Sequence, residues 1–277
     1  MSEFPRTMVG GVSMPRLICG SNWFLGFSHT SRAKDRFIKE LFDTPQKVAD
    51  LMEVFMRYGC NAVMAPSFEM VALAIEEVRQ RTGEDMIYIC TPGYKDGPDS
   101  WKAAVDEAKQ FGATFCFPHQ SVTDPRLDRV NRCLHPQLVE RLQYVRDMEM
   151  IPGLSSHTPE SVVCSDASDA DVETYIQPYN AAGFLCQVET DWVQNIIHNA
   201  RKPVMTIKPL AAGRLMPPTG LTFVWNTIRD CDMVTLGTFN TYEAEEDIEL
   251  SLACLERRKA EVELQKTRSK RSISSEQ

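Results

Sequence analysis

The stretch Val204-Met-Thr-Ile-Lys-Pro-Leu-Ala-Ala-Gly-Arg214 indicates the fold of this chain more directly than any other. It begins with apolar and β-branched residues, which is the composition of a buried strand. Pro209 has no N–H to donate to a neighbouring strand, so the strand should end at Lys208. Small residues and Gly213 follow, and they allow backbone or ligand to approach closely. A strand that ends in a lysine and a glycine-containing loop is typical of the way a barrel enzyme presents its active site.

Outward from this stretch, short apolar runs alternate with longer amphipathic runs along the whole chain. Alternation of this kind predicts a parallel sheet covered by helices, and eight units in about 250 residues predict a single (β/α)8 TIM barrel. A doubly wound open sheet is the alternative. The expected strands are 14–21, 61–65, 86–91, 113–119, 151–156, 172–179, 203–208 and 231–237. The expected helices are 45–59, 69–83, 98–112, 135–148, 158–167, 189–200, 217–230 and 242–264.

No break in composition divides the chain, so residues 1–264 are expected to form one domain. Residues 22–44, after the first strand, are too polar and irregular for core and unusually long for a connection. Residues 265–277 are polar and basic, a composition that predicts a disordered tail.

The composition restricts the classes of partner. The chain has 277 residues, 43% hydrophobic and 25% charged, and a net charge of −8, which argues against nucleic acid. No apolar run approaches the roughly 20 residues that span a bilayer, and the N-terminus lacks the features of a signal peptide. The nine cysteines are scattered without a CxxC pair. These features predict a reduced, cytoplasmic protein with a small-molecule ligand and no membrane partner, and they leave a homo-oligomer open.

The carboxyl ends of the predicted strands carry the candidate site residues, because a barrel builds its active site there. A histidine at a strand end is as often structural as catalytic, but several on one rim favour a site. A lysine there could pair with an acid, contact a phosphate or, if desolvated, form a Schiff base. The catalytic candidates are His119, His157 and Lys208, and the substrate-binding candidates are Asn22, Trp23, His29, Glu69, Gln177 and Asn180.

Sequence motifs for cofactors are missing. The chain contains no GxGxxG, no Walker-type loop and no HExxH. His29, His119 and His157, with Glu69, could bind a metal only through spacing that the fold would set. The sequence therefore predicts neither a particular metal nor its absence.

Five segments in register resemble the aldo-keto reductase superfamily. The stretch Lys208-Pro-Leu-Ala-Ala-Gly213 looks like the family's strand-seven segment. The others are Asn61-Ala-Val-Met-Ala-Pro-Ser-Phe68, Leu154-Ser-Ser-His-Thr-Pro-Glu160, Tyr175-Ile-Gln-Pro-Tyr-Asn180, and Thr235-Leu-Gly-Thr238 with Tyr242-Glu-Ala-Glu-Glu-Asp247. The resemblance implies a TIM barrel and a site at its C-terminal rim.

The catalytic residues of the family are largely replaced. Its Asp, Tyr and Lys positions correspond to Val63, Phe68 and Pro92, and the family's His survives as His119. Phe68 has no proton to donate and Pro92 has no charge that could lower a pKa. The resemblance therefore implies a divergent member that does not use the usual reductase mechanism.

The resemblance makes NADPH a candidate cofactor and places Gln177, Asn180 and Lys208 near its nicotinamide. Family members hold the 2′-phosphate with a basic residue after the last strand, where this chain has Thr238-Phe-Asn-Thr-Tyr242 and an acidic run. This difference predicts loss of NADPH or a change of ligand.

Two classes of function follow. The favoured one is an enzyme acting on a small carbonyl or hydroxyl compound or a carbohydrate, with His119 and His157 as acid and base, Lys208 and Asn180 orienting the substrate, and the first loop as cover. A bound metal would favour lyase, isomerase or hydrolase chemistry instead. The other class is a non-catalytic ligand-binding or partner protein, with the last helix and basic tail as its interaction surface.

Overall fold

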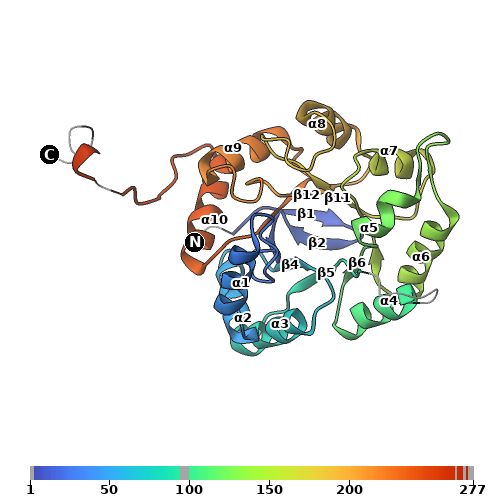
Figure 1. Ribbon diagram of the computed structural model, residues 1–277, viewed down its shortest axis with the longest axis horizontal. Coiled ribbons are helices and arrows are strands. Elements are labelled where there is room, and N and C mark those ends of the chain that lie inside the picture. The colour runs from blue at the N-terminus through green and yellow to red at the C-terminus, as the bar shows by residue number, and fades with distance from the viewer. Residues whose placement is uncertain (1–2, 94–99, 266, 271–272, 274–277) are drawn as a thin grey trace.

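A ring of parallel strands surrounded by helices forms the molecule (Figure 1). The computed structural model describes residues 3–93, 100–265, 267–270 and 273. The strand order is β10-β11-β12-β13-β3-β4-β5-β6-β9, and all neighbours are parallel. Because β9 and β10 are successive pieces of one strand, the sheet closes into an eight-stranded barrel. The predicted TIM barrel is confirmed, and closure excludes the open sheet.

The elements follow the predicted alternation. The barrel strands are β3 (Leu17–Gly20), β4 (Ala62–Ala65), β5 (Ile87–Cys90), β6 (Phe115–Cys116), β9 (Ile151–Pro152), β10 (Leu154–Ser155), β11 (Tyr175–Pro178), β12 (Val204–Ile207) and β13 (Met233–Leu236). The longer helices are α1 (Arg32–Leu41), α2 (Pro45–Met56), α3 (Glu69–Thr82), α4 (Ser100–Gln110), α6 (Pro136–Asp147), α7 (Glu160–Ala167), α8 (Thr190–Asn199), α9 (Pro217–Thr227) and α10 (Thr241–Glu256). Shorter elements are α5 (Gln120–Thr123), η1 (Asp124–Arg126), η2 (Arg268–Lys270) and the hairpin of β7 (Leu127–Asp128) and β8 (Cys133–Leu134).

Local sequence explains where the helices begin and end. Helix α2 starts with Pro45, and the side chain of Thr44 accepts the N–H of Lys47. Helix α3 ends at Gly83, whose φ of 75° is a left-handed conformation that glycine adopts without strain. Apolar residues of the helix faces then pack against the outer faces of the strands in one continuous core.

A separate apolar cluster fills the inside of the barrel. Its members come from seven strands and from an N-terminal hairpin, β1 (Arg6–Val9) and β2 (Val12–Pro15). Val9 and Met14 of the hairpin are at most 1% exposed. Gly10, in the hairpin turn, lies against Ile151 at the N-terminal start of β9. The hairpin therefore closes the N-terminal end of the barrel. The sequence prediction of one strand over 14–21 is wrong here, because the chain turns after Pro15.

The fifth barrel strand is interrupted at Gly153. A Cβ atom at this position would lie 2.5 Å from Cε1 of Phe117, a fully buried ring inside the barrel. Glycine is required because no side chain fits between the strand and that ring.

A helix lies within the segment expected to be a long irregular connection. Helix α1 begins after Ser31, whose side chain accepts the N–H of Lys34, and it buries Ile38 completely. Phe24 and Phe42 are also buried and pack with their ring centroids 6.3 Å apart. The expectation that residues 22–44 are too polar for the core is wrong at these three positions.

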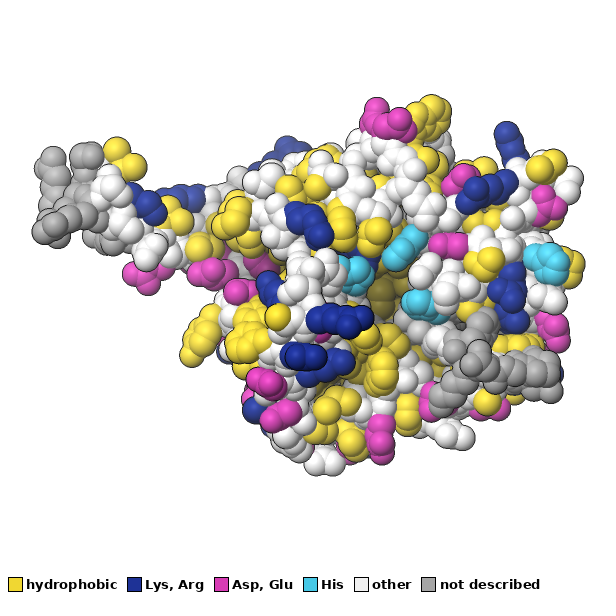
Figure 2. All heavy atoms as spheres, in the orientation of Figure 1, with side chains coloured by type: hydrophobic (Ala, Val, Ile, Leu, Met, Phe, Trp, Pro, Cys, Tyr) yellow, Lys and Arg dark blue, Asp and Glu magenta, His cyan; other side chains and the backbone are white. Residues whose placement is uncertain are grey.

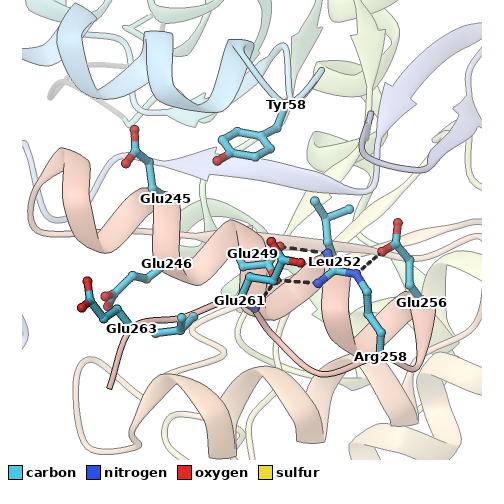
Figure 3. Close-up of a pocket in the computed structure, with 10 residues that line it drawn as sticks. Tyr58, Glu245, Glu246, Glu249, Leu252, Glu256, Arg258, Glu261 and Glu263 are labelled. Atoms are coloured by element: carbon cyan, nitrogen blue, oxygen red, sulfur yellow. Dashed lines mark hydrogen bonds and ion pairs between the residues drawn. The ribbon is translucent and has the colours of Figure 1, made fainter. Parts of the chain in front are cut away.

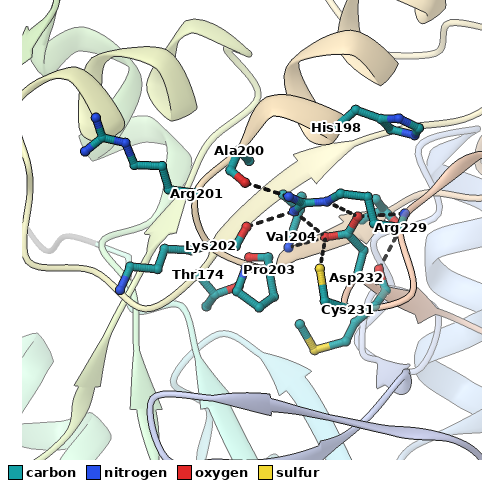
Figure 4. Close-up of polar contacts among 12 residues, drawn as sticks. Thr174, His198, Ala200, Arg201, Lys202, Pro203, Val204, Arg229, Cys231 and Asp232 are labelled. Atoms are coloured by element: carbon teal, nitrogen blue, oxygen red, sulfur yellow. Dashed lines mark hydrogen bonds and ion pairs between the residues drawn. The ribbon is translucent and has the colours of Figure 1, made fainter.

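A polar network stabilises the N-terminal ends of β12 and β13 (Figure 4). The guanidinium of Arg229 donates to the backbone oxygens of Ala200 and Lys202 and to the fully buried carboxylate of Asp232. Asp232 also accepts the backbone N–H of Val204 at 2.8 Å. These contacts join the N-terminal ends of the two strands and stabilise the barrel at the end opposite the rim.

All nine cysteines are free. Among the described residues, no helix combines the length and apolar composition needed to cross a membrane. Tyr94, the start of the helix expected at 98–112 and much of the tail 265–277 lie outside the described residues.

Candidate functional site

Three histidines and one lysine meet at the C-terminal rim of the barrel. His29 follows β3, His119 follows β6, His157 follows β10 and Lys208 follows β12 directly. They are close enough that the charge of Lys208 lowers the pKa of all three histidines. Figure 2 shows histidine side chains gathered around a central hollow, with lysine and arginine side chains beside it. The structure thus brings both predicted catalytic histidines and Lys208 together.

The ring of His119 has a defined orientation. Its Nδ1 accepts the backbone N–H of Ser121 at 3.3 Å and lies 2.8 Å from the Ser121 hydroxyl. Because Nδ1 accepts, the proton of the neutral ring is on Nε2. Burial lowers the pKa of His119, Asp124 raises it and Lys208 lowers it further. His119 is therefore suited to donate a hydrogen bond from Nε2.

The ring of His29 has the opposite arrangement. Its Nδ1 lies 2.9 Å from the carbonyl oxygen of Phe27, which can only accept, so Nδ1 carries the proton. The neutral ring keeps a lone pair on Nε2. Partial burial and the charge of Lys208 lower the pKa of His29.

His157 is half-buried, and no described residue forms a hydrogen bond with its ring nitrogens. Burial, then Lys208, His119 and His29, lower the pKa of His157 to about 4. At neutral pH both its ring nitrogens are thus available to a ligand, one as donor and one as acceptor.

Lys208 is held in an unusual backbone conformation. Its φ is 64°, and Ala211, Ala212 and Gly213 also have positive φ values of 50°, 56° and 81°. Each non-glycine residue in this region costs roughly 1 kcal/mol or more, so the surrounding packing must impose the loop. Gly220 of α9 contributes, since a Cβ there would lie 2.7 Å from the carbonyl oxygen of Pro209.

The amine of Lys208 has no acidic partner among the described residues. Burial alone lowers its pKa to about 8. Its charge lowers the pKa of all three rim histidines, so it lies near them, and no ion pair among the described residues neutralises it.

Asp124 is a site residue that the strand-end search missed. Its carboxylate accepts the hydroxyl of Ser156 at 2.5 Å and the backbone N–H of His157 at 3.3 Å. Burial raises the pKa of Asp124, and these hydrogen bonds oppose that change. The carboxylate fixes the turn that carries His157. Only its place in η1, five residues beyond His119, could have drawn attention to it.

Two predicted substrate contacts face protein instead. Gln177 is fully buried, lies on the outer face of β11 and donates to the hydroxyl of Ser161 in α7 at 2.9 Å. Asn180 is also fully buried, and its amide bonds both the N–H and the carbonyl oxygen of Phe184, at 2.8 and 3.0 Å. These contacts are structural, so direct substrate binding by either side chain does not fit the geometry.

The loop that Asn180 organises returns to the rim. The guanidinium of Arg214 lies 4.1 Å from the centroid of the Phe184 ring and donates to the carbonyl oxygen of His29 at 3.3 Å. The rings of Phe184 and His29 are edge to face at 6.4 Å. Asn180 therefore contributes to the site by positioning Phe184.

Aromatic side chains line the other side of the rim. Trp23 packs edge to face with Phe239 at 5.8 Å and under the amine of Lys34 at 4.6 Å. Phe27 and the exposed Phe68 have ring centroids 6.4 Å apart. The mouth thus combines a basic side with an apolar side.

Asn22 and Glu69 contribute less to the site than the other predicted residues. The backbone oxygen of Asn22 accepts the N–H of Phe27 at 2.8 Å, which closes the turn of the first loop. Glu69 is the exposed first residue of α3, where an acid is favourable at the helix N-terminus.

The residues at the rim do not fit NADPH reduction. Phe68 and Pro92 supply neither the phenol nor the amine that the reaction uses. Trp23 lies over the ends of β12 and β13, since a Cβ at Gly237 would be 2.7 Å from its Cδ1 and one at Gly213 would be 3.8 Å from its Cζ2. The residues at the rim therefore do not supply a nicotinamide-dependent reduction step.

Within residues 3–93 and 100–265, no three His, Cys, Asp or Glu side chains are placed to hold a metal ion. A second hollow of about 680 Å³ lies between α10 and the chain after it (Figure 3). Its glutamates include Glu249 and Glu256, which pair with Arg258, so these charges serve the packing of that segment.

Comparisons support the fold. An aldo-keto reductase structure from Pseudomona aeruginosa has a TM-score of 0.65 at 14% identity and covers 90% of this chain and 95% of its own. The protein Gox0644 has a TM-score of 0.61 at 11% identity, and the match covers 96% of this chain and 97% of Gox0644. Aldose reductase from Giardia lamblia has a TM-score of 0.56 at 10% sequence identity, and the match covers 91% of this chain and 89% of the reductase. No family model and no curated protein match the sequence. The predicted resemblance to aldo-keto reductases is confirmed at the level of fold, which does not determine activity.

Proposed function

We propose that this protein is an enzyme that binds a small anionic carbonyl or hydroxyl compound in the barrel mouth and moves protons on it. The observation that carries the proposal is the cluster of His29, His119, His157 and Lys208. All four pKa values are lowered, chiefly by burial, and those of the three histidines are lowered also by the positive charge of Lys208. A bound anion would interact favourably with Lys208, which has no acidic partner among the described residues, whereas Asp124 holds the turn at 156–158 and acts on His119.

The histidines divide the chemistry between them. His119, with its proton on Nε2, is suited to donate a hydrogen bond to the carbonyl oxygen of the ligand and to stabilise charge that develops there. His157 is neutral and has no protein partner among the described residues, so it is the residue proposed to accept a proton from the carbon beside that carbonyl. A bound anion would raise its pKa from about 4 toward the range that favours proton transfer. Lys208 binds the anionic group, and the aromatic side formed by Trp23 and Phe68 covers the carbon chain.

Binding is tested by following the histidine ring protons by NMR. Pyruvate and dihydroxyacetone phosphate are the anionic probes, and dihydroxyacetone is the neutral comparison. We expect both anions to shift the resonances of His29, His119 and His157 and the neutral compound to shift them far less. His135, which caps helix α6, and His198, in the last turn of helix α8, are internal references. If the anions shift none of the rim resonances, or no more than the neutral compound does, the proposal is wrong.

Catalysis is tested separately from binding. In deuterated water, the protein should speed the exchange of the protons beside the carbonyl of a bound probe, and His157→Gln should reduce that rate by at least tenfold. Binding without exchange would support the non-catalytic ligand-binding alternative. A nicotinamide fluorescence titration with NADPH and NADH tests the reductase alternative, and elemental analysis tests the metal-dependent one.

A further inference from the structure

We propose that Lys208 is a covalent nucleophile, whose Nζ forms an imine with the carbonyl carbon of the bound compound. This inference rests on the proposed function, because it uses the same ligand and the same barrel mouth. It goes further by assigning a bond-forming role to a side chain that would otherwise only attract the anion.

The first argument is the placement of the amine. Lys208 follows β12 directly, and its left-handed backbone directs the chain away from the strand at that residue. No described residue pairs with Nζ, although Asp124 lies on the same rim near His119. An amine that serves only to bind an anion gains nothing from such strain, whereas a nucleophile must be held at a fixed point.

The second argument is the state of the amine. A lysine with an ordinary pKa is almost wholly protonated at neutral pH and cannot attack a carbonyl. Burial lowers the pKa of Lys208 to about 8. Roughly a tenth of the molecules then carry the free amine at pH 7, compared with about three in ten thousand for an ordinary lysine. Desolvation of this kind is a recognised way to activate a lysine.

The third argument is that His157 is close enough to Lys208 for the charge of the lysine to lower its pKa, so a proton carrier is available on the same rim. The pair on Nζ attacks the carbonyl carbon, a C–N bond forms, and the oxygen takes one amine proton by way of His157. The C–O bond of this adduct then breaks, the nitrogen pair forms C=N, and the second amine proton follows the same route to the departing oxygen. Both amine protons leave in one water molecule, so no oxidant, reductant or other reactant is needed.

The experiment is reductive trapping on the full chain. The protein is mixed with pyruvate or dihydroxyacetone phosphate and sodium borohydride, then measured by intact mass and peptide mapping. With pyruvate, an imine reduced by hydride adds the mass of pyruvic acid less one oxygen atom. We expect one adduct per chain, on the peptide that contains Lys208. Lys202→Arg, which changes a half-buried lysine before β12 that pairs with Glu173, should leave the yield unchanged.

Lys208→Arg separates this inference from the proposed function. Arginine keeps the positive charge but cannot form the imine, so the anionic probes should still shift the rim histidines while trapping falls at least tenfold. Histidine shifts without any adduct in the unaltered protein, or equal trapping in Lys208→Arg, would overturn the covalent role and leave the binding proposal standing. Absence of histidine shifts would overturn both.

Discussion

Replacing Lys208 by Met should raise the pKa of His157, and the structure limits by how much. Methionine has a similar volume, so it removes the charge and keeps the burial. The pKa of His157 is about 4 instead of its ordinary 6.5, and burial is a larger cause than Lys208. Lys208 therefore accounts for less than half of the pKa difference of about 2.5. In Lys208→Met, His157 should have a pKa between 4 and about 5.2.

The assay is a pH titration of the histidine ring protons by NMR in both proteins. His157 is identified by the resonance that disappears in His157→Gln. His29 and His119 should change in the same direction, because Lys208 lowers the pKa of each. An unchanged titration of His157, or a lower pKa, would show that Lys208 does not face the histidines and would refute the description of the site.

Two further predictions concern stability. The folded chain holds His157 neutral while the unfolded chain protonates it near 6.5, so the stability it contributes is present above pH 6.5 and is lost as the pH falls to about 4. His157→Gln should reduce this pH dependence by up to about 3 kcal/mol in urea unfolding. Gly153→Ala should cost about 1–3 kcal/mol, because its Cβ would meet Phe117 at 2.5 Å. Gly93→Ala, with no atom of the described residues within 4 Å of its Cβ, is the matched control, and an equal loss in both variants would contradict the packing argument.

The barrel was predictable because each strand–helix unit carries its own pattern. The hairpin at 6–15 was not recognised, since Val9-Gly-Gly-Val12 has a hairpin-type turn but strands of only four residues each. Helix α1 was missed for a related reason. Its sequence is amphipathic, but the helix has only ten residues, and Phe37, Ile38 and Leu41 are its only large apolar residues.

The candidate site was predictable in part. His119, His157 and Lys208 follow strand ends, and the ends of parallel strands meet at one rim whatever the details of packing. Gln177 was misplaced because side chains alternate along a strand, and Ile176 beside it takes the inward position. Asp124 could not be found, because its contact with Ser156 joins residues 32 apart in a loop that no pattern describes.

The N-terminal hairpin has a consequence for how molecules pass through the protein. The hairpin of β1 and β2 covers the N-terminal end of the barrel and side chains fill its interior, so the barrel is open only at its C-terminal rim. A ligand and whatever replaces it must use the same opening, so the first has to depart before the second can enter. Any water consumed or released in the mouth travels by that route as well, past the ring of Trp23 and the loop that Asn180 holds.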